Sequence, residues 1–502
     1  MGDGLRPAVR RLRRAAAVGL SVLLAPAAVA GDVTLTSPDR GFVLTGELLS
    51  YTPEIYRIAT RYGPLTVAAD GVACEGACPD LAAYVPEFRL IGAPALGRVL
   101  LPALLEAYGF RHGLGVRRSQ TGNGATVLTY TERGAAEEVA RFILTEADSA
   151  AARDAVEAGR AEAVLAVGDP EENDGLQSWL LALDAVVPAV SRANPLREIA
   201  MSDLQGVLAG QISDWAALGG APGPIRLHAL GPPETDALAG GSSPRAVVRH
   251  AEPEGLARAI AGDATALGLA RLSRLGPTEP LALVGSCGRR LVASAATLKA
   301  EDWPLTVPLL VRVRPGPRPD VADAFLAWAT GPDAAAIVER TGLVAPHVAE
   351  VPMSQQGIRL ANAIAAAGDE VSLADLQAML RRLDGARRLT PSFRFREGGT
   401  ELDAQSQGNI ALLAEAIGDG TFAGREMLLA GFTDGEGPAA QNRRLALTRA
   451  ETVRAALFAA IPNGAEGPRA VDVAGFGEAL PMACDDTEWG RQVNRRVEVW
   501  LR

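Results

Sequence analysis

Hydrophobic and polar positions divide the chain into stretches with different periodicities. Short runs of alternating apolar and polar residues, separated by Pro, Gly and Asp, fill residues 31–85 and predict a small β-rich module. Across residues 86–350, strand patterns such as 88–93 alternate with helix-like patterns such as 99–110 and 137–144. This alternation predicts an α/β domain with a largely parallel sheet, long enough to form two lobes with a cleft between them.

The last third of the chain has two further patterns. Residues 351–387 carry helical spacing, and Ser372 stands three residues before Asp375 as in a capping box. We interpret this stretch as a helical connector rather than a coiled coil, because no heptad persists over three repeats. Residues 388–502 read as strand, helix, strand, helix, strand and strand, a compact βαβαββ unit. The predicted fold class is therefore a multidomain chain of α/β and α+β type.

The first thirty residues have the layout of a secretory signal peptide. Five arginines precede an apolar run at residues 15–25, and Ala28-Val29-Ala30 gives a small-x-small pattern before cleavage at Gly31. An apolar run of this length is too short for a membrane span, which needs about 20 residues. We expect residues 1–30 to direct export to the periplasm, and an uncleaved anchor is the alternative.

The acidic balance of the chain excludes one class of partner. The sequence has 49 basic and 59 acidic side chains, a net charge of −10, which becomes −14 when the predicted leader is removed. Proteins that bind nucleic acids usually present a basic patch or stripe. We therefore expect no nucleic-acid partner.

Reactive side chains are scarce. Lys299 is the only lysine, and the four histidines, His112, His228, His250 and His347, lack the spacing of metal ligands. The signatures G-x-S-x-G, H-E-x-x-H and the Walker loop are absent from the sequence. We predict no metal, no cofactor and no enzymatic activity.

The four cysteines fall into two pairs. An exported chain permits disulfides, and Cys74 and Cys78 stand close together in C-E-G-A-C, which predicts a disulfide that closes a small loop. The other two, Cys287 and Cys484, are far apart in the sequence. The spacing leaves open whether these two pair across domains or stay free.

An acid and an arginine near the C-terminus are placed to share one pocket. Asp434 ends a predicted strand at a Gly-rich turn, and Asn442 and Arg449 lie on one face of the helix that follows. A carboxylate can hold an ammonium, and the guanidinium fork can hold a carboxylate through two parallel bonds. Such a pocket suits a small zwitterion, and the alternative from spacing alone is an ordinary surface ion pair.

Fixed spacings around this pair carry a family resemblance. The shared positions are Gly431, Thr433, Asp434, Asn442, Leu445, Arg449, Ala450, Gly475, Gly477, Glu478, Pro481, Gly490, Arg491, Asn494, Arg495, Arg496, Val497 and Glu498. This pattern resembles the C-terminal domain of the OmpA family, which binds peptidoglycan.

The resemblance implies a role for each matched site residue. It implies that Asp434 and Arg449 hold the diaminopimelate of the peptidoglycan stem peptide. It also implies that Thr433 and Asn442 lie at the pocket and that Arg495 or Arg496 completes it. One departure from the family is Phe432, which stands where a histidine is usual.

The middle of the chain carries a second resemblance. Residues 182–227 contain, in order, Asp184, Asn194-Pro195, Gly210-Gln211-Ile212, Asp214-Trp215 and Gly219-Gly220. This order resembles the phosphate-binding proteins of ABC importers. The resemblance covers most of residues 86–350 and implies a two-lobed type II periplasmic binding fold with its ligand in the cleft between the lobes.

The ligand positions of that second resemblance are altered. The residues that we assign to the cleft are Gly92, Thr121, Gly122, Gly124 and Asp169. The loop after Gly92 lacks hydroxyl groups, and Pro94 removes an amide donor. Two acids, Glu234 and Asp236, stand where neutral or positive groups are usual, and a carboxylate repels an anion.

The sequence as a whole predicts a non-catalytic protein of the cell envelope. It binds peptidoglycan, stays in the periplasm on the outer-membrane side, and carries a wall-tethered domain for solute binding or scaffolding. One alternative is a receptor that delivers phosphate, or another small anion, to an ABC permease. A second alternative is a purely structural linker between the wall and an envelope protein.

Overall fold

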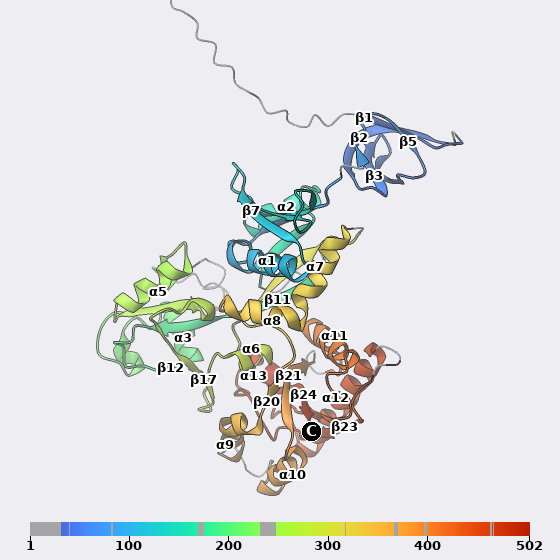
Figure 1. Cartoon of the computed structure of the whole chain (residues 1–502). Helices are drawn as coiled ribbons and strands as arrows, with labels where there is room; N and C mark the ends of the chain where they lie inside the picture. The colour runs from blue at the N-terminus through green and yellow to red at the C-terminus, as the bar shows by residue number, and fades with distance from the viewer. Residues whose placement is uncertain are drawn as a thin grey trace, which may run out of the picture. The chain divides into compact units, whose positions relative to one another are not determined.

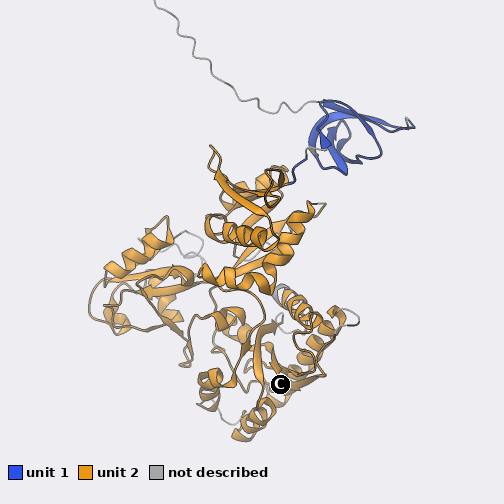
Figure 2. Cartoon of the chain, in the orientation of Figure 1, with its two compact units in different colours: residues 1–86 blue, residues 87–502 orange. Residues whose placement is uncertain are grey.

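The chain divides into two compact units, residues 1–86 and residues 87–502 (Figure 2). The predicted signal peptide lies outside the described part of the chain. No helix within the described residues is long and apolar enough to cross a membrane. The computed structural model describes residues 32–39, 41–81, 84–168, 175–230, 247–316, 318–365, 370–395, 399–461, 464 and 466–502.

The first unit is an antiparallel sheet that encloses a small core. Its strands are ordered β4-β3-β2-β1-β5, and alternate residues such as Val33, Leu35 and Ile58 are fully buried. A disulfide joins Cys74 of β5 to Cys78 just beyond the strand. The predicted β-rich module is confirmed, with β1 (Asp32–Thr36), β2 (Val43–Tyr51), β3 (Ile55–Thr60), β4 (Gly63–Ala68) and β5 (Ala73–Gly76).

A long mixed sheet runs through the middle domain (Figure 1). Its strand order is β14-β13-β15-β11-β19-β10-β6-β9-β8-β7. The bounds are β6 (Glu87–Gly92), β7 (Gly115–Gln120), β8 (Thr126–Thr131), β9 (Glu138–Glu146), β10 (Ala163–Val167), β11 (Gln177–Val190), β13 (Arg226–Ala229), β14 (Val247–Arg249), β15 (Ala266–Arg271) and β19 (Thr306–Val313).

Strand β11 connects two lobes, each with its own core. Its first half pairs with β19 and places Leu181 in one core, and its second half pairs with β15 and places Val187 in the other. Lobe 1 contains β6–β10 with α1 (Leu101–Arg111), α2 (Ser149–Glu157), α7 (Asp320–Thr330) and α8 (Pro332–Arg340). Lobe 2 contains β12 (Glu198–Ala200), β13–β15, β17 (Ala282–Val284), β18 (Arg290–Leu291), α3 (Met201–Leu208), α5 (Pro253–Gly262) and α6 (Ala295–Lys299).

Two expectations about the middle domain are wrong. Residues 137–144 were expected to be helical, but they belong to strand β9, where Ala140, Phe142 and Leu144 are buried and the residues between them are not. This alternation has the period of a strand with one buried face. The sheet is also not largely parallel, because β11 and β19 run antiparallel to each other and to their outer neighbours.

The C-terminal domain has the predicted βαβαββ order, with a short extra helix before the last strand. Its sheet is ordered β20-β21-β24-β22-β23, and Ser372 and Asp375 form the expected capping box of α10. The bounds are β20 (Glu350–Val351), α9 (Gly357–Ala365), α10 (Leu373–Leu383), β21 (Arg387–Arg394), α11 (Ala404–Gly418), β22 (Glu426–Gly431), α12 (Ala439–Ala460), β23 (Ala470–Gly475), α13 (Glu488–Asn494) and β24 (Arg496–Leu501).

A fully buried carboxylate at Glu498 gathers three arginines inside this domain. Its oxygens lie 2.5 Å from Arg359 of α9, 2.8 Å from Arg496 and 3.6 Å from Arg388. Burial opposes ionisation, but the three guanidinium groups hold the pKa of Glu498 well below its usual value. The carboxylate therefore ties α9 to strands β21 and β24.

The same cluster continues into lobe 2. Arg388 Nη1 lies 3.1 Å from the buried carboxylate of Asp302, and Arg394 Nη1 lies 2.6 Å from Glu301. Glu301 also accepts a hydrogen bond of 2.8 Å from Asn409 of α11. Because breaking a buried pair leaves an uncompensated charge, these contacts fix the C-terminal domain against lobe 2.

We predict that Glu498→Gln destabilises residues 87–502 by about 3–5 kcal/mol at pH 7, measured by urea unfolding, because three buried guanidinium groups lose their shared carboxylate. Since the folded pKa of Glu498 is lowered, its contribution is present above the unfolded pKa and is lost as the pH falls. The difference in the free energy of unfolding between the variant and the unmodified chain should therefore decrease below about pH 4. A matched control is Glu426→Gln, which breaks a more exposed pair with Arg469 and should cost less than about 1 kcal/mol. An equal cost for both variants would contradict the role of Glu498.

Candidate functional site

The candidate site lies where strand β22 ends and helix α12 begins. The helix packs unusually close to the sheet, because a Cβ at Gly431 would stand 2.0 Å from the carbonyl oxygen of Ala446. A Cβ at Gly475 on the neighbouring strand would stand 2.4 Å from the carbonyl oxygen of Arg443. These glycines let the buried face of α12 approach the loop that holds Asp434.

Arg449 is buried on that helix face with part of its hydrogen-bonding capacity unused. Its side chain is 1% exposed, and Nε and Nη2 donate to the Gly399 carbonyl at 3.2 and 3.1 Å. The guanidinium carbon also lies 5.2 Å from the centre of the Phe395 ring. Among the described residues, nothing accepts a hydrogen bond from Nη1. Burial lowers the pKa of Arg449 to about 10, and Asp434 opposes this shift, so the group stays charged near neutral pH.

Asp434 is held from the other side by Arg495. Its Oδ2 lies 3.0 Å from Arg495 Nη1, and Arg495 Nη2 lies 2.6 Å from Glu488 at the start of α13. The Asp434 side chain is 13% exposed and the Arg495 side chain 8%. The structure thus gathers Asp434, Arg449 and Arg495 in one charged group, next to the half-exposed Glu488.

Two further predicted residues shape the loop beside Asp434. Thr433 is buried, and its amide donates to the Gly477 carbonyl at 2.9 Å. Asn442 uses its amide nitrogen on Glu478 at 2.5 Å and on the Gly437 carbonyl at 3.3 Å. Asn442 therefore stabilises the turn after Asp434, and its amide nitrogen is already hydrogen-bonded to protein atoms.

Arg496 belongs to a different cluster from Arg495. Its side chain is fully buried, where it pairs with Glu498 and donates to the Leu480 carbonyl at 2.8 Å. Its guanidinium carbon lies 4.5 Å from the centre of the Phe432 ring, which is itself fully buried. Arg496 is the first residue of β24, whereas Arg495 precedes the strand at the end of α13. Of the two arginines named from the sequence, the structure brings only Arg495 to Asp434, while Phe432 faces the core.

A loop that sequence reasoning gave no role forms another wall of the site. Asp485 accepts a hydrogen bond of 2.9 Å from the amide of Gly435, next to Asp434. Asn494 donates to Asp485 at 2.7 Å and accepts from the amides of Met482 and Ala483. Asn494 is one of the positions that carry the OmpA-family resemblance, and this match is the sequence signal that could have pointed to the loop.

A disulfide anchors this loop to lobe 2. It joins Cys484 to Cys287, which follows β17, and so settles the pairing that the sequence left open. Arg289 of lobe 2 adds a hydrogen bond of 2.9 Å to the Ala483 carbonyl. A Cβ at Gly285 would lie 2.3 Å from the Cys484 sulfur, so this position needs glycine. The loop at 482–485 is therefore held by Asn494 on one side and by lobe 2 on the other.

Four of the five residues that the sequence assigns to the middle-domain cleft are among the described residues, and they lie at one edge of the sheet. Gly92 ends β6, next to the end of the parallel strand β9, and Thr121, Gly122 and Gly124 form the turn between β7 and β8 at the same edge. That turn is exposed and closes on itself through hydrogen bonds between Thr121 and Ala125. The predicted Asp169, and the acids Glu234 and Asp236, lie outside the described residues.

An arginine that the sequence did not single out lies near this edge. Arg98, in the helical turn after Gly92, makes a two-pronged contact of 2.6 and 2.7 Å with Glu146. Its third nitrogen lies 2.9 Å from Glu252, which precedes α5 of lobe 2. Arg98 therefore links the two lobes, and its charge is already shared between two carboxylates of the chain.

Metal ligands do not gather in the described part of the chain, where no group of three His, Cys, Asp or Glu side chains is placed to hold an ion. At the candidate site, the unbonded nitrogen of Arg449 and the carboxylate of Asp434 offer charged groups for ionic recognition of a ligand.

Comparison with protein families supports two assignments. A model of the OmpA family matches residues 394–495, and a model of a PBP superfamily domain matches residues 92–333. Outer membrane porin F of Pseudomonas fluorescens is 37% identical over 93 residues, which are 18% of this chain and 27% of the porin. The chain thus spans about a quarter of the length of that relative.

Solved structures include similar chains for both domains. A phosphate transport receptor of ABC type from Vibrio cholerae is 16% identical, with 52% of this chain and 100% of the receptor covered and a TM-score of 0.41. The peptidoglycan-associated lipoprotein from Burkholderia pseudomallei is 24% identical, with 22% of this chain and 89% of the lipoprotein covered and a TM-score of 0.19.

We predict that replacing Cys287 and Cys484 by alanine together lowers the free energy of unfolding by about 2–4 kcal/mol, because the bond closes a long loop. The measurement is urea unfolding of the full chain, in which tryptophan fluorescence follows the transition of residues 87–502. The matched control replaces Cys74 and Cys78, which lie in the first unit and should leave that transition unchanged. A transition that does not respond to loss of the Cys287–Cys484 bond would contradict its role as an anchor.

Proposed function

We propose, starting from a chain that joins a PBP superfamily domain to a C-terminal OmpA-family domain, that this protein binds peptidoglycan and thereby tethers its middle domain to the cell wall. The proposed ligand is the diaminopimelate residue of the stem peptide, whose side chain ends in an ammonium and a carboxylate. The proposed place of action is the periplasm, on the outer-membrane side of the wall. The activity is binding rather than catalysis.

The observation that carries this proposal is the unfilled bonding capacity of Arg449. Its Nη1 is buried without a described acceptor, although an unsatisfied buried donor costs about 1–3 kcal/mol. A ligand carboxylate would satisfy it through a charge-assisted bond. Nearby, Asp434 offers a carboxylate to an ammonium, and its pair with Arg495 fixes where that carboxylate points.

The expected strength of binding follows from the number of charged contacts. Each hydrogen bond to a charged group contributes about 1.5–3 kcal/mol, so two such contacts correspond to dissociation constants between about millimolar and tens of micromolar. Many such sites on one wall polymer would retain the protein without an irreversible anchor. A reversible tether is therefore the mode of attachment that we propose.

The middle domain is proposed to act as a fixed binding or scaffolding platform rather than as a phosphate shuttle. Arg98, the cation near its cleft edge, is engaged by Glu146 and Glu252. An anion that used Arg98 would have to displace both carboxylates or bind beside them, and like charges repel. Receptor activity for an ABC importer and a purely structural link to an envelope protein are the competing functions.

We predict that Asp434→Ala and Arg449→Ala each abolish sedimentation of the full chain with purified sacculi. Each substitution removes one of the two charges that the zwitterion requires and should weaken binding at least tenfold, because a charge-assisted bond contributes about 1.5–3 kcal/mol.

The control for sedimentation is Arg444→Ala, which removes an exposed arginine from the same helix α12. This variant should sediment like the unmodified chain. Retained sedimentation of both Asp434→Ala and Arg449→Ala, in chains that unfold at the normal urea concentration, would refute the proposed wall-binding site.

We predict that inorganic phosphate binds the full chain with a dissociation constant weaker than micromolar, because the cation beside the cleft edge is already paired. Titration calorimetry at pH 7 measures this directly. In Glu252→Gln, which removes one competing carboxylate, the affinity for phosphate should rise. A submicromolar constant for the unmodified chain would instead favour the receptor function.

A further inference from the structure

A short series of contacts leads from the disulfide between lobe 2 and the C-terminal domain to Asp434. Cys484 is followed by Asp485, whose Oδ2 accepts a hydrogen bond of 2.9 Å from the amide of Gly435, the residue after Asp434. The main-chain carbonyl of Asp485 also accepts a hydrogen bond of 2.9 Å from Arg491. A change at Cys484 can therefore reach the backbone beside Asp434 through one residue and one hydrogen bond.

The two cysteines of this bond differ in exposure and in their polar contacts. Cys287 is exposed, whereas Cys484 is only 5% exposed. The amide of Cys287 donates to the Cys484 sulfur at 3.1 Å, and Nη1 of Arg289 donates to the Cys287 sulfur at 3.3 Å. Nearby cations and donors favour a thiolate over a thiol. Each sulfur thus has a donor that would stabilise it as a thiolate once the bond is broken.

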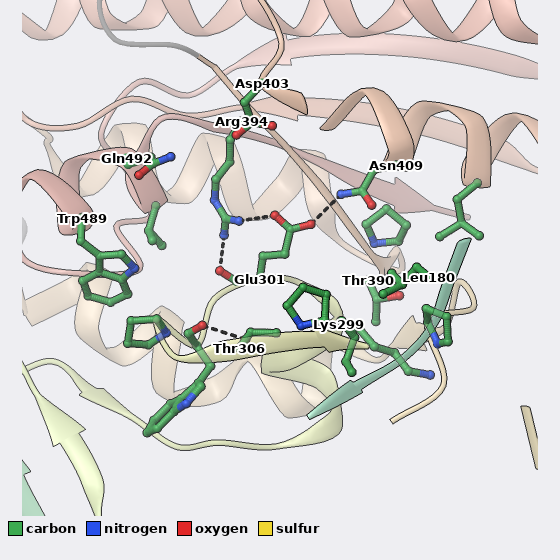
Figure 3. A pocket seen from close by; sticks show the side chains of 18 residues that line it. Leu180, Lys299, Glu301, Thr306, Thr390, Arg394, Asp403, Asn409, Trp489 and Gln492 are labelled. Carbon is green, nitrogen blue, oxygen red and sulfur yellow. Dashed lines mark hydrogen bonds and ion pairs between the residues drawn. The ribbon is translucent and has the colours of Figure 1, made fainter. Parts of the chain in front are cut away.

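The packing between α13 and lobe 2 leaves a cavity of about 260 Å³. Trp489 and Gln492 of α13 and Glu301 of lobe 2 are among the residues that line it (Figure 3). Trp489 packs in part against the core of lobe 2 and in part against the cluster that contains Ala483. Atoms that border a cavity lack packing partners on that side. The loop at 482–485 is therefore attached to lobe 2 mainly by the disulfide and by the hydrogen bond from Arg289 to Ala483.

We infer that the Cys287–Cys484 bond is a redox-sensitive switch that sets the order of the loop beside Asp434. In the oxidised state, the bond holds the loop at 482–485 on lobe 2 and so fixes the backbone next to Asp434. When a dithiol reduces the bond, the loop is released from lobe 2, and this backbone becomes less ordered. Because Asn494 still holds the loop within the domain, the change is a partial loosening rather than unfolding.

Reduction proceeds by two exchange steps with an external dithiol. The first thiolate of the dithiol attacks the exposed Cys287 sulfur, the S–S bond breaks, and its electron pair leaves on Cys484. The second thiolate then attacks the mixed disulfide, which frees Cys287 and closes the dithiol as a cyclic disulfide. Two electrons pass from the dithiol to the chain, and the two protons that the dithiol loses balance the two cysteine thiolates.

The consequence for attachment to the wall rests on the proposed function. A less ordered loop has to lose more conformational freedom when the stem peptide binds at Asp434 and Arg449. The oxidised chain should therefore bind the wall more tightly than the reduced chain, and a dithiol would favour release of the middle domain from the wall.

The first test is hydrogen exchange, which needs no ligand. The full chain with Cys74→Ala and Cys78→Ala keeps one disulfide, so dithiothreitol reduces only the bond in question. Mass spectrometry of peptides that cover residues 431–437 should show amide exchange at least about threefold faster after reduction, because the bonded amide in this segment opens more often. A smaller change would overturn the inference. In the control with Cys287→Ala and Cys484→Ala, dithiothreitol should leave the exchange unchanged.

Single-thiol variants test which sulfur the dithiol attacks. In the chain that lacks Cys74 and Cys78, Cys484→Ala leaves Cys287 as the only thiol, and Cys287→Ala leaves Cys484. Each thiol forms a mixed disulfide with 5,5′-dithiobis(2-nitrobenzoate), and this reaction has the same access requirement as the first exchange step. Cys287 should react at least about tenfold faster, because it is exposed. Equal rates, or a faster Cys484, would overturn the proposed route of reduction.

Sedimentation with purified sacculi separates the switch from the proposed function. The oxidised chain with Cys74→Ala and Cys78→Ala should bind, and the same chain after reduction should bind at least about threefold more weakly. Cooperative urea unfolding of the reduced chain confirms that it is folded. Failure of the oxidised chain to bind would refute the proposed wall binding, and hydrogen exchange would still decide the switch. Equal affinity of the two forms, with wall binding intact, would overturn the inference.

Discussion

The second unit depends on a carboxylate that is wholly removed from water. Glu498 has no exposed surface, and its charge is stable only because Arg359, Arg388 and Arg496 surround it. Burying an isolated carboxylate would cost several kcal/mol. The elements that carry the three arginines must therefore pack around Glu498. Arg388 in turn reaches Asp302, and this passes the constraint into lobe 2. The cluster thus connects α9, β21 and β24 to one another and to lobe 2.

The proposed wall-peptide site is attached to this junction through the loop beside Asp434. Its outer loop is bonded to Asn494 within the domain and to Cys287 of lobe 2, so neither side can move without the other. A preorganised pocket loses less conformational entropy when it binds. Fixing the loop would therefore favour the proposed recognition of a small zwitterion by Asp434 and Arg449. The same rigidity would hold the middle domain at a set orientation relative to the wall polymer.

Much of this organisation could be predicted from the sequence, for identifiable reasons. Local patterns such as the capping box at Ser372 depend on neighbouring residues only, and the placement of Asn442 and Arg449 on the buried face of α12 follows from helix spacing. The prediction of a helix at residues 137–144 is wrong because the spacing of their apolar residues fits a helix and a strand alike. Pairing with the neighbouring strands β6 and β8 makes this segment a strand. The choice between Arg495 and Arg496 depends on which elements pack around each side chain, because Arg496 is buried with Glu498 while Arg495 meets Asp434. The link from Cys287 to Cys484 depends on how two domains pack. Neither is encoded in local spacing.

The central claim is that Asp434 and Arg449 together recognise a side chain that ends in both an ammonium and a carboxylate. The most direct measurement compares the affinities of free meso-diaminopimelate and of Nα-acetyl-L-lysine methylamide, whose only charge is the side-chain ammonium, by calorimetry on the full chain. The account predicts that diaminopimelate binds at least tenfold more tightly, because only it can bond the free nitrogen of Arg449 while its ammonium stays on Asp434. Equal affinity for the two compounds would contradict it.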